Sequence, residues 1–150
     1  MTELPDALHD KVVALSEAGD ALAEDGNYRK AIETYIEALE LLPQPSTQWE
    51  AATWLLTAIG DANFLAGNFE YAGKALSDAM FCPGAIGNPF IHMRLGQVQF
   101  ELGNLDRAAD ELARAYLQEG KVIFEADDPK YLEFVKSKLD PPPGGWPDGW

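Results

Sequence analysis

The sequence predicts an all-α fold, an α-solenoid in which three helix-turn-helix hairpins stack side by side. The main observation is a pattern that occurs three times, Gly-x6-Gly-x-(Tyr/Phe/Leu)-x2-Ala-x6-Ala, beginning at Gly19, Gly60 and Gly96. Self-similarity at a period of roughly 20 to 50 residues is typical of arrays whose units are too small to bury their own apolar face. Composition agrees, because 47% of the 150 residues are hydrophobic and alanine is abundant.

The repeated small residues indicate close packing of two antiparallel helices. Small residues seven positions apart lie about two turns apart on one helical face, where a second helix can approach. Gly19 and Ala31 are therefore expected contact points, with Gly26-Asn27 as the turn between the helices. Three bulky residues are expected to fill the space under the turns: Tyr28, Phe69 and Leu105.

Prolines, glycines and capping residues along the chain predict where seven helices begin and end. Pro5 suits the first turn of the first helix, and Pro43 ends the second. Thr47 with Glu50 three residues later reads as a capping box, so the third helix should start near Thr47. The extra residues of the first repeat step, 41 against 36, would lengthen that helix by about two turns. The expected helices span about residues 5–25, 28–42, 47–66, 69–81, 89–102, 106–124 and 129–138.

The later helices follow from similar signals. Asn88-Pro89 and Asp128-Pro129 each offer an N-cap followed by a proline at the first helical position, and Gly120 predicts a bend. The helix at 129–138 has an apolar and a charged face, as expected of a helix that caps an array. We expect one domain at 1–139, with repeat units at about 12–45, 53–86 and 89–122.

Residues 140–150 form an extended or disordered tail by composition, rich in Pro and Gly. Its two tryptophans, Trp146 and Trp150, either pin the tail onto the domain or anchor a partner.

Residues 12 to 120 resemble the tetratricopeptide repeat. The first unit carries the most positions of that pattern, and they are Leu15, Gly19, Gly26, Tyr28, Ala31, Tyr35, Ala38 and Pro43. The second unit departs from it at Asn63 and Leu76, and the third at His92, Gln99 and Gly120.

The resemblance implies a concave groove lined by the first helix of each hairpin, where such proteins bind partners. The implied groove is aromatic at its centre and acidic at its rim, although Phe64 and Phe100 could equally be core residues. The groove residues carried over are Asp20, Glu24, Trp54, Thr57, Asp61, Phe64, Phe90, Met93, Arg94, Gln97, Phe100 and Glu101.

The groove composition argues against one known use of the family. Members that grip the acidic C-terminus of a heat-shock chaperone do so with Lys, Asn and Arg side chains. Of the corresponding residues here only Arg94 matches, and a peptide carboxylate would meet Asp20 and Asp61. A basic ligand is therefore favoured.

Charge and composition narrow the class of partner. The net charge of −14 argues against nucleic acid or an anionic membrane, because both associations need Lys and Arg near phosphates. The acidity either simply keeps the protein soluble or attracts a basic partner. No apolar stretch approaches the roughly 20 residues of a membrane span, the acidic start is unlike a secretory signal, and the single Cys82 cannot form an internal disulfide. We expect a cytoplasmic protein.

The sequence does not predict an enzyme. His9 and His92 are far apart, with no Cys or carboxylate at ligand spacing, and His92 is expected to pack in the core. No metal and no cofactor are expected. The prediction is a protein-binding module for a basic or partly apolar protein.

The chain also resembles small stand-alone bacterial tetratricopeptide proteins, some of which look like immunity proteins that neutralise toxins. The competing hypothesis is a scaffold or chaperone that holds a short segment of a larger assembly. A homodimer through the apolar middle unit is compatible with either.

Overall fold

A computed structural model describes residues 3–141 and 143–145 of the chain, and the regular structure of these residues is helical. The α-helices are α1 (Asp6–Glu24), α2 (Tyr28–Glu40), α3 (Glu50–Leu65), α4 (Phe69–Ala79), α5 (Pro89–Glu101), α6 (Leu105–Glu119) and α7 (Pro129–Lys138). Two short 3₁₀ helices, η1 (Ser46–Gln48) and η2 (Gly120–Phe124), precede α3 and follow α6. The all-α class with three hairpins and a capping helix is confirmed. Within the described residues, no helix is long and apolar enough to cross a membrane.

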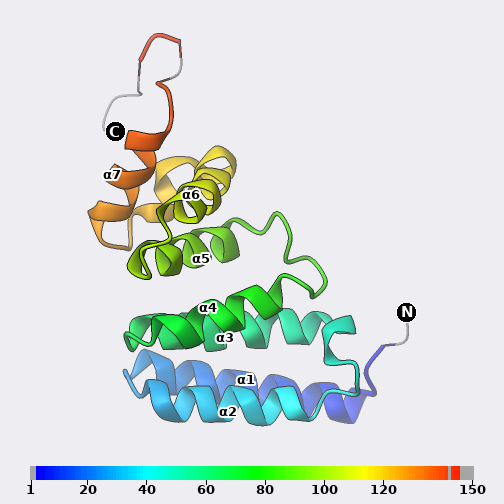
Figure 1. The fold of residues 1–150 in the computed structure, drawn as a ribbon. Coiled ribbons are helices and arrows are strands. Elements are labelled where there is room, and N and C mark those ends of the chain that lie inside the picture. The colour runs from blue at the N-terminus through cyan, green and yellow to red at the C-terminus, as the bar shows by residue number, and fades with distance from the viewer. Residues whose placement is uncertain (1–2, 142, 146–150) are drawn as a thin grey trace. The chain divides into compact units, whose positions relative to one another are not determined.

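The chain forms two compact units, which divide between Ile86 and Gly87. In the first unit α1–α2 and α3–α4 are antiparallel hairpins, and α3 packs against α2 (Figure 1). In the second unit α5–α6 is the third hairpin, and η2 and α7 pack against α6. The expectation of one domain at 1–139 stays a prediction. The tail residues Trp146 and Trp150 lie outside the described residues.

The helical glycines allow the two helices of each hairpin to touch. Each predicted close approach is confirmed, and the residue that meets the glycine lies 16 positions further along the chain. A Cβ in place of the glycine hydrogen would lie 2.5 Å from Tyr35 Cε1 at Gly19, 2.5 Å from Leu76 Cγ at Gly60, and 2.7 Å from Leu112 Cγ at Gly96. A side chain of any size would therefore push the helices apart.

The turns between the paired helices share one geometry. Gly26, Gly67 and Gly103 have φ of +79°, +84° and +84°, a region that only glycine adopts without strain. The N–H of the following asparagine donates to the carbonyl five residues earlier, as in Asn27 N to Leu22 O at 2.9 Å. This is the hydrogen bond that closes a helix C-terminus in the Schellman motif. The predicted turns are confirmed.

The two predicted N-caps, Asn88 and Asp128, are also confirmed, and Asn27 of the first turn caps α2 as well. The side chain of Asn27 accepts from the N–H of Lys30 at 3.4 Å, and Asn88 accepts from Ile91 N at 3.2 Å. Asp128 accepts from the N–H of Lys130 at 3.0 Å. Short-range capping therefore fixes the starts of α2, α5 and α7.

The predicted capping box at Thr47 and Glu50 is wrong. Thr47 lies in η1, and α3 begins only at Glu50, after an extended Trp49 with φ −102° and ψ 135°. Trp49 is buried and its Nε1–H donates to the carbonyl of Pro43 at 2.8 Å. Burial of the indole thus decides where the helix can start.

The extra residues of the first repeat step do lie in helices, but in two of them. The connectors 41–49 and 80–88 are each nine residues long. Helix α2 has 13 residues against 11 in α4, and α3 starts ten residues before its glycine where α5 starts seven before. These differences of two and three residues account for the five extra residues.

Two expectations about the third hairpin are wrong. Leu105 is exposed, so it does not fill the space under its turn, whereas Tyr28 and Phe69 are half-buried. The sixth helix ends at Glu119, because Gly120 takes φ +69°, and the following residues form η2. The expected bend at Gly120 is a break.

Gly96→Ala tests the close approach. Alanine is the better helix former by about 1 kcal/mol, but its methyl group would lie 2.7 Å from Leu112 Cγ and 3.0 Å from the Leu112 backbone nitrogen. We expect a net loss of about 1–3 kcal/mol in the free energy of unfolding by urea. The double variant with Leu112→Ala should lose less than the sum of the single variants, because the new methyl group enters the space that leucine leaves. A more stable Gly96→Ala protein would contradict this account.

Candidate functional site: the α1–α3 face

The first unit brings six of the predicted groove residues onto one side of α1 and α3. Residues of α3 at 54, 57, 61 and 64 recur every three or four positions and so share a face, as do residues 20 and 24 of α1. We call this surface the α1–α3 face, formed by Asp20, Glu24, Trp54, Thr57, Asp61 and Phe64.

Three carboxylates of this face act on one buried phenol. The hydroxyl of Tyr35 donates to Asp20 Oδ1 at 2.6 Å. Burial raises the pKa of Tyr35 most, and the negative charges of Asp20, Asp61 and Glu24 raise it further. Carboxylates from α1 and α3 therefore lie close enough to the Tyr35 hydroxyl to make the electrostatic potential there negative.

The apolar side chains of the α1–α3 face differ in how exposed they are. Trp54 is 42% exposed. Phe64 is half-buried, with its ring 5.6 Å from that of Phe69, and the hydroxyl of Thr57 donates to its own helix at Thr53 O, 2.7 Å away. Trp54 is therefore the main apolar group that this face offers to a partner.

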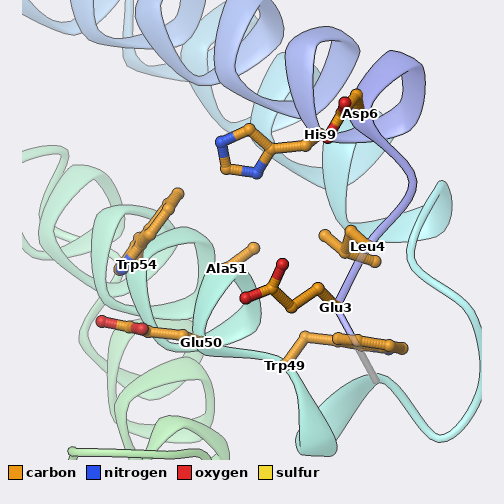
Figure 2. Close-up of a pocket in the computed structure, with 8 residues that line it drawn as sticks. All are labelled: Glu3, Leu4, Asp6, His9, Trp49, Glu50, Ala51 and Trp54. Carbon is orange, nitrogen blue, oxygen red and sulfur yellow. The ribbon is translucent and has the colours of Figure 1, made fainter. Parts of the chain in front are cut away.

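A cavity of about 520 Å³ lies where the N-terminal arm meets the starts of α1 and α3 (Figure 2). Its described wall combines three carboxylates with two indoles and an imidazole. The lining residues are Glu3, Leu4, Asp6, His9, Trp49, Glu50, Ala51 and Trp54. Only Trp54 belongs to the predicted groove.

Sequence reasoning missed the other residues of this cavity for identifiable reasons. His9 was detectable, because it precedes Asp20 by 11 residues, about three helical turns, and so continues the face of α1. Glu3 and Trp49 were not detectable, since an irregular arm and a connector meet here and neither has a periodic pattern.

The groove positions of α5 in the second unit are covered by the chain itself. Met93, Arg94 and Gln97 are buried at 2%, 6% and 0% exposure, and Phe90 lies against Arg94 with its ring centroid 5.2 Å from the guanidinium carbon. The expectation that these side chains face an open groove is not met within this unit. Their role in binding a partner stays a prediction.

Asp127 supplies the covering carboxylate. Arg94 Nη1 donates to Gln97 Oε1 at 2.7 Å and to Asp127 Oδ1 at 3.2 Å, and Gln97 Nε2 donates to Asp127 Oδ2 at 3.2 Å. Buried polar groups need such partners, because an unsatisfied donor or charge is costly. The cation that a ligand carboxylate would need is thus neutralised internally.

The end of α5 is covered by α7 in the same way. Lys130 Nζ lies 2.6 Å from Glu101 Oε1, and the Tyr131 hydroxyl donates to the same oxygen at 2.9 Å. The hydrogen bond of Lys130 to Glu101 raises the pKa of Lys130, and burial followed by the bond to Glu101 raises that of Tyr131. The ring of Phe100 packs edge-on against Tyr131 and Phe134 at centroid distances of 5.5 and 5.1 Å.

His92 is a core residue, as predicted. Its Nε2 accepts from the N–H of Gly87 at 3.0 Å, which leaves Nδ1 to donate to Glu111 Oε2 at 2.5 Å. Both ring nitrogens are thus engaged with the protein. Among residues 3–141 and 143–145, no group of three His, Cys, Asp or Glu side chains could hold a metal ion.

The fold resembles that of tetratricopeptide helical-repeat proteins. Residues 13–45 match the tetratricopeptide repeat family, which covers the first hairpin. A search of curated proteins gave no significant match. For the rest of the chain the likeness is one of fold.

Solved structures show that likeness along most of the chain. The second tetratricopeptide domain of human RPAP3, in complex with the HSP70 peptide SGPTIEEVD, is 18% identical with a TM-score of 0.67, covering 89% of this chain and 99% of that one. The Yersinia enterocolitica type III secretion chaperone SycD, with a peptide of the translocator YopD, is 15% identical with a TM-score of 0.67, covering 85% and 92%. The first such domain of Spaghetti (RPAP3), bound to the HSP90 peptide SRMEEVD, is 20% identical with a TM-score of 0.65, covering 85% and 92%.

Arg94→Ala tests whether the buried ion pair holds the second unit together. It would leave Asp127 and Gln97 with fewer partners at low exposure, so we expect a loss of about 3 kcal/mol in the free energy of unfolding by urea. Arg114→Ala is the control, because Arg114 pairs with Asp110 at the surface and should cost no more than about 0.5 kcal/mol. Equal losses for the two variants would show that the Arg94 pair contributes nothing special.

Proposed function

We propose that the protein is a non-enzymatic binding module whose α1–α3 face holds a basic, partly apolar segment of another protein. The observation that carries this proposal is the excess of acidic over basic side chains in the first unit. Residues 1–86 contain 14 acidic and 4 basic side chains, a net charge of −10. Helix α1 has a single Lys11 and α3 has no Lys or Arg. No enzyme family is indicated by the comparisons with known proteins.

The few cations of the first unit are mostly placed elsewhere. Arg29 pairs with Glu33 on α2, and Lys74 pairs with Asp78 on α4. Helices α1 and α3 together therefore contain one Lys or Arg side chain, Lys11. Such a potential attracts basic partners and speeds their encounter.

The fold supports binding of a peptide, but the charge supports a different one from those in the related structures. The bound peptides SRMEEVD and SGPTIEEVD each contain three acidic residues. The α1–α3 face would repel that sequence, while its exposed Trp54 and its carboxylates suit a segment with basic and apolar side chains.

The role we infer is that of an immunity protein, which covers a basic surface of a cognate bacterial toxin in the cytoplasm. A small protein with a net charge of −14 suits an inhibitor that must reach its target quickly. Co-expression with the product of a neighbouring reading frame that is toxic on its own should restore growth. A chain that neither restores growth nor binds that product would exclude this role.

A second candidate role is that of a scaffold or chaperone-type adaptor, which holds a short segment of a larger assembly. The fold likeness to SycD, solved with a peptide of a translocator, favours it. In that case an isolated segment of the partner should bind as tightly as the whole partner. An inhibitor that covers a folded surface should instead lose most of its affinity for isolated segments.

Sedimentation analysis of the free chain would reveal a homodimer that uses the same apolar residues.

A matched pair of triple variants tests the surface itself. Asp20→Asn, Glu24→Gln and Asp61→Asn remove three charges from the α1–α3 face and keep side-chain shape. Glu33→Gln, Glu37→Gln and Glu40→Gln remove three charges from exposed positions of α2. We expect the first set to weaken the complex with a partner recovered by pull-down by about tenfold or more and the second by less than about threefold, measured by calorimetry near physiological salt. Equal losses would move the binding site away from this face.

A further inference from the structure

We propose that the cavity at the start of α1 and α3 is an anchor site for one arginine side chain of the partner. The inference rests on the proposed function in that the partner is basic, and it adds a location and a residue type. The observations behind it are the volume of the cavity, and an indole and three carboxylates in its wall that have no bonded partner or counter-ion among the described residues.

The cavity has the size of a binding site. Its volume of about 520 Å³ falls within the roughly 300–1,000 Å³ of known ligand pockets. That space exceeds the needs of one side chain, so a neighbouring apolar residue of the partner would fit against Leu4, Trp49 and Ala51 as well.

The two indoles of the cavity wall differ in exposure and in hydrogen bonding. Trp49 is 8% exposed and its Nε1–H is bonded to Pro43 O. Trp54 is 42% exposed, and no described residue gives it a hydrogen bond, a ring contact or a cation. An indole face is the best aromatic surface for a cation, and stacking is strongest when the contact is desolvated in a cavity. Elsewhere the chain itself provides such a pair, with Arg94 over Phe90.

The charges of the wall have one sign. Glu3, Asp6 and Glu50 line the cavity, the described wall contains no Lys or Arg, and none of the three carboxylates has an ion-pair partner among the described residues. Figure 2 shows the Glu3 carboxylate directed toward the middle of the lining residues, whereas the Glu50 carboxylate extends away from it. A metal ion is not the expected occupant, because these side chains do not form a group of three that could bind one.

Arginine fits this combination better than lysine. A guanidinium is planar, so it can lie flat on the Trp54 indole while its N–H groups donate in plane to carboxylates. A lysine ammonium is a strongly hydrated point charge, which loses more hydration on entering the cavity and does not stack.

The cavity continues the α1–α3 face and therefore sets the distance between two basic residues of the partner. Asp20 follows His9 by 11 residues on α1, about 16 Å along the helix axis, and Asp61 follows Trp54 by seven residues, about 10 Å. An extended segment of roughly three to five residues spans that distance. A partner that places arginine in the cavity would thus present a second basic residue to Asp20 and Asp61 about three to five positions away.

The test uses the full chain and a defined probe, the peptide acetyl-Gly-Leu-Arg-Leu-Gly-amide, followed by the Trp54 indole N–H in two-dimensional NMR spectra. We expect a saturating shift of that signal, about tenfold weaker binding when citrulline replaces arginine, and a smaller loss with lysine. Equal binding of the citrulline peptide, or a titration that does not curve up to about 10 mM, would overturn the proposal.

Variants locate the probe in the cavity. Trp54→Ala and the pair Glu3→Gln with Glu50→Gln should each weaken binding about fivefold or more, while Trp54→Phe, which keeps an aromatic face, should lose less than Trp54→Ala. Binding to the alanine variant is read from backbone amide shifts of Ala51, and its fold is checked by circular dichroism. The control is Glu33→Gln with Glu37→Gln, with the same change of charge on α2. Equal effects of the cavity pair and the control pair would show general attraction only.

The same variants separate this inference from the proposed function. Suppose that the partner protein loses affinity with the Asp20, Glu24 and Asp61 variant but not with the cavity variants. The α1–α3 face then binds the partner and the arginine site is wrong. If spermine binds as tightly as the arginine peptide and is indifferent to Trp54→Ala, the cavity selects charge alone, and the arginine assignment fails.

Discussion

Each hairpin of this chain depends on one helical glycine pressed against a large side chain of the following helix. Because that glycine has no Cβ, the two helices can touch, and their contact fixes which sides of α1 and α3 remain uncovered in the first unit. In the first hairpin the same contact also positions a functional group. The ring of Tyr35 packs on Gly19, and its hydroxyl bonds the carboxylate of the adjacent Asp20. The packing that closes the hairpin therefore also orients part of the acidic face.

The two units share one repeat pattern, but their charged side chains are arranged in opposite ways. In the second unit, charged groups of α5 are neutralised from within the chain, Arg94 by Asp127 and Glu101 by Lys130. In the first unit, Glu3, Asp6 and Glu50 have no such counter-ions among the described residues. Internal pairing stabilises the second unit by satisfying buried charge, and its absence in the first leaves an electrostatic potential that a partner can use.

The features that the sequence predicted are those that depend on near neighbours along the chain. Hairpins, glycine turns and the caps at Asn27, Asn88 and Asp128 follow from contacts a few residues apart, or from a spacing that repeats. The errors arose where distant residues decide. The start of α3 depends on where Trp49 is buried, and the burial of Gln97 depends on Asp127, 30 residues away. The cavity needs an arm and a connector that lie more than 40 residues apart, and no local pattern encodes that meeting.

In the proposed function, the net charge of −14, rather than the fold, selects the ligand. Burial is the main cause of the raised pKa of Tyr35, and three carboxylates from α1 and α3 raise that pKa further, because their charges disfavour a phenolate. In the proposed function, a bound cation would reduce the negative potential of the α1–α3 face. A basic partner would therefore find complementary charge on that face. Under the same proposal, an acidic peptide like those in the similar structures would be repelled by this charge.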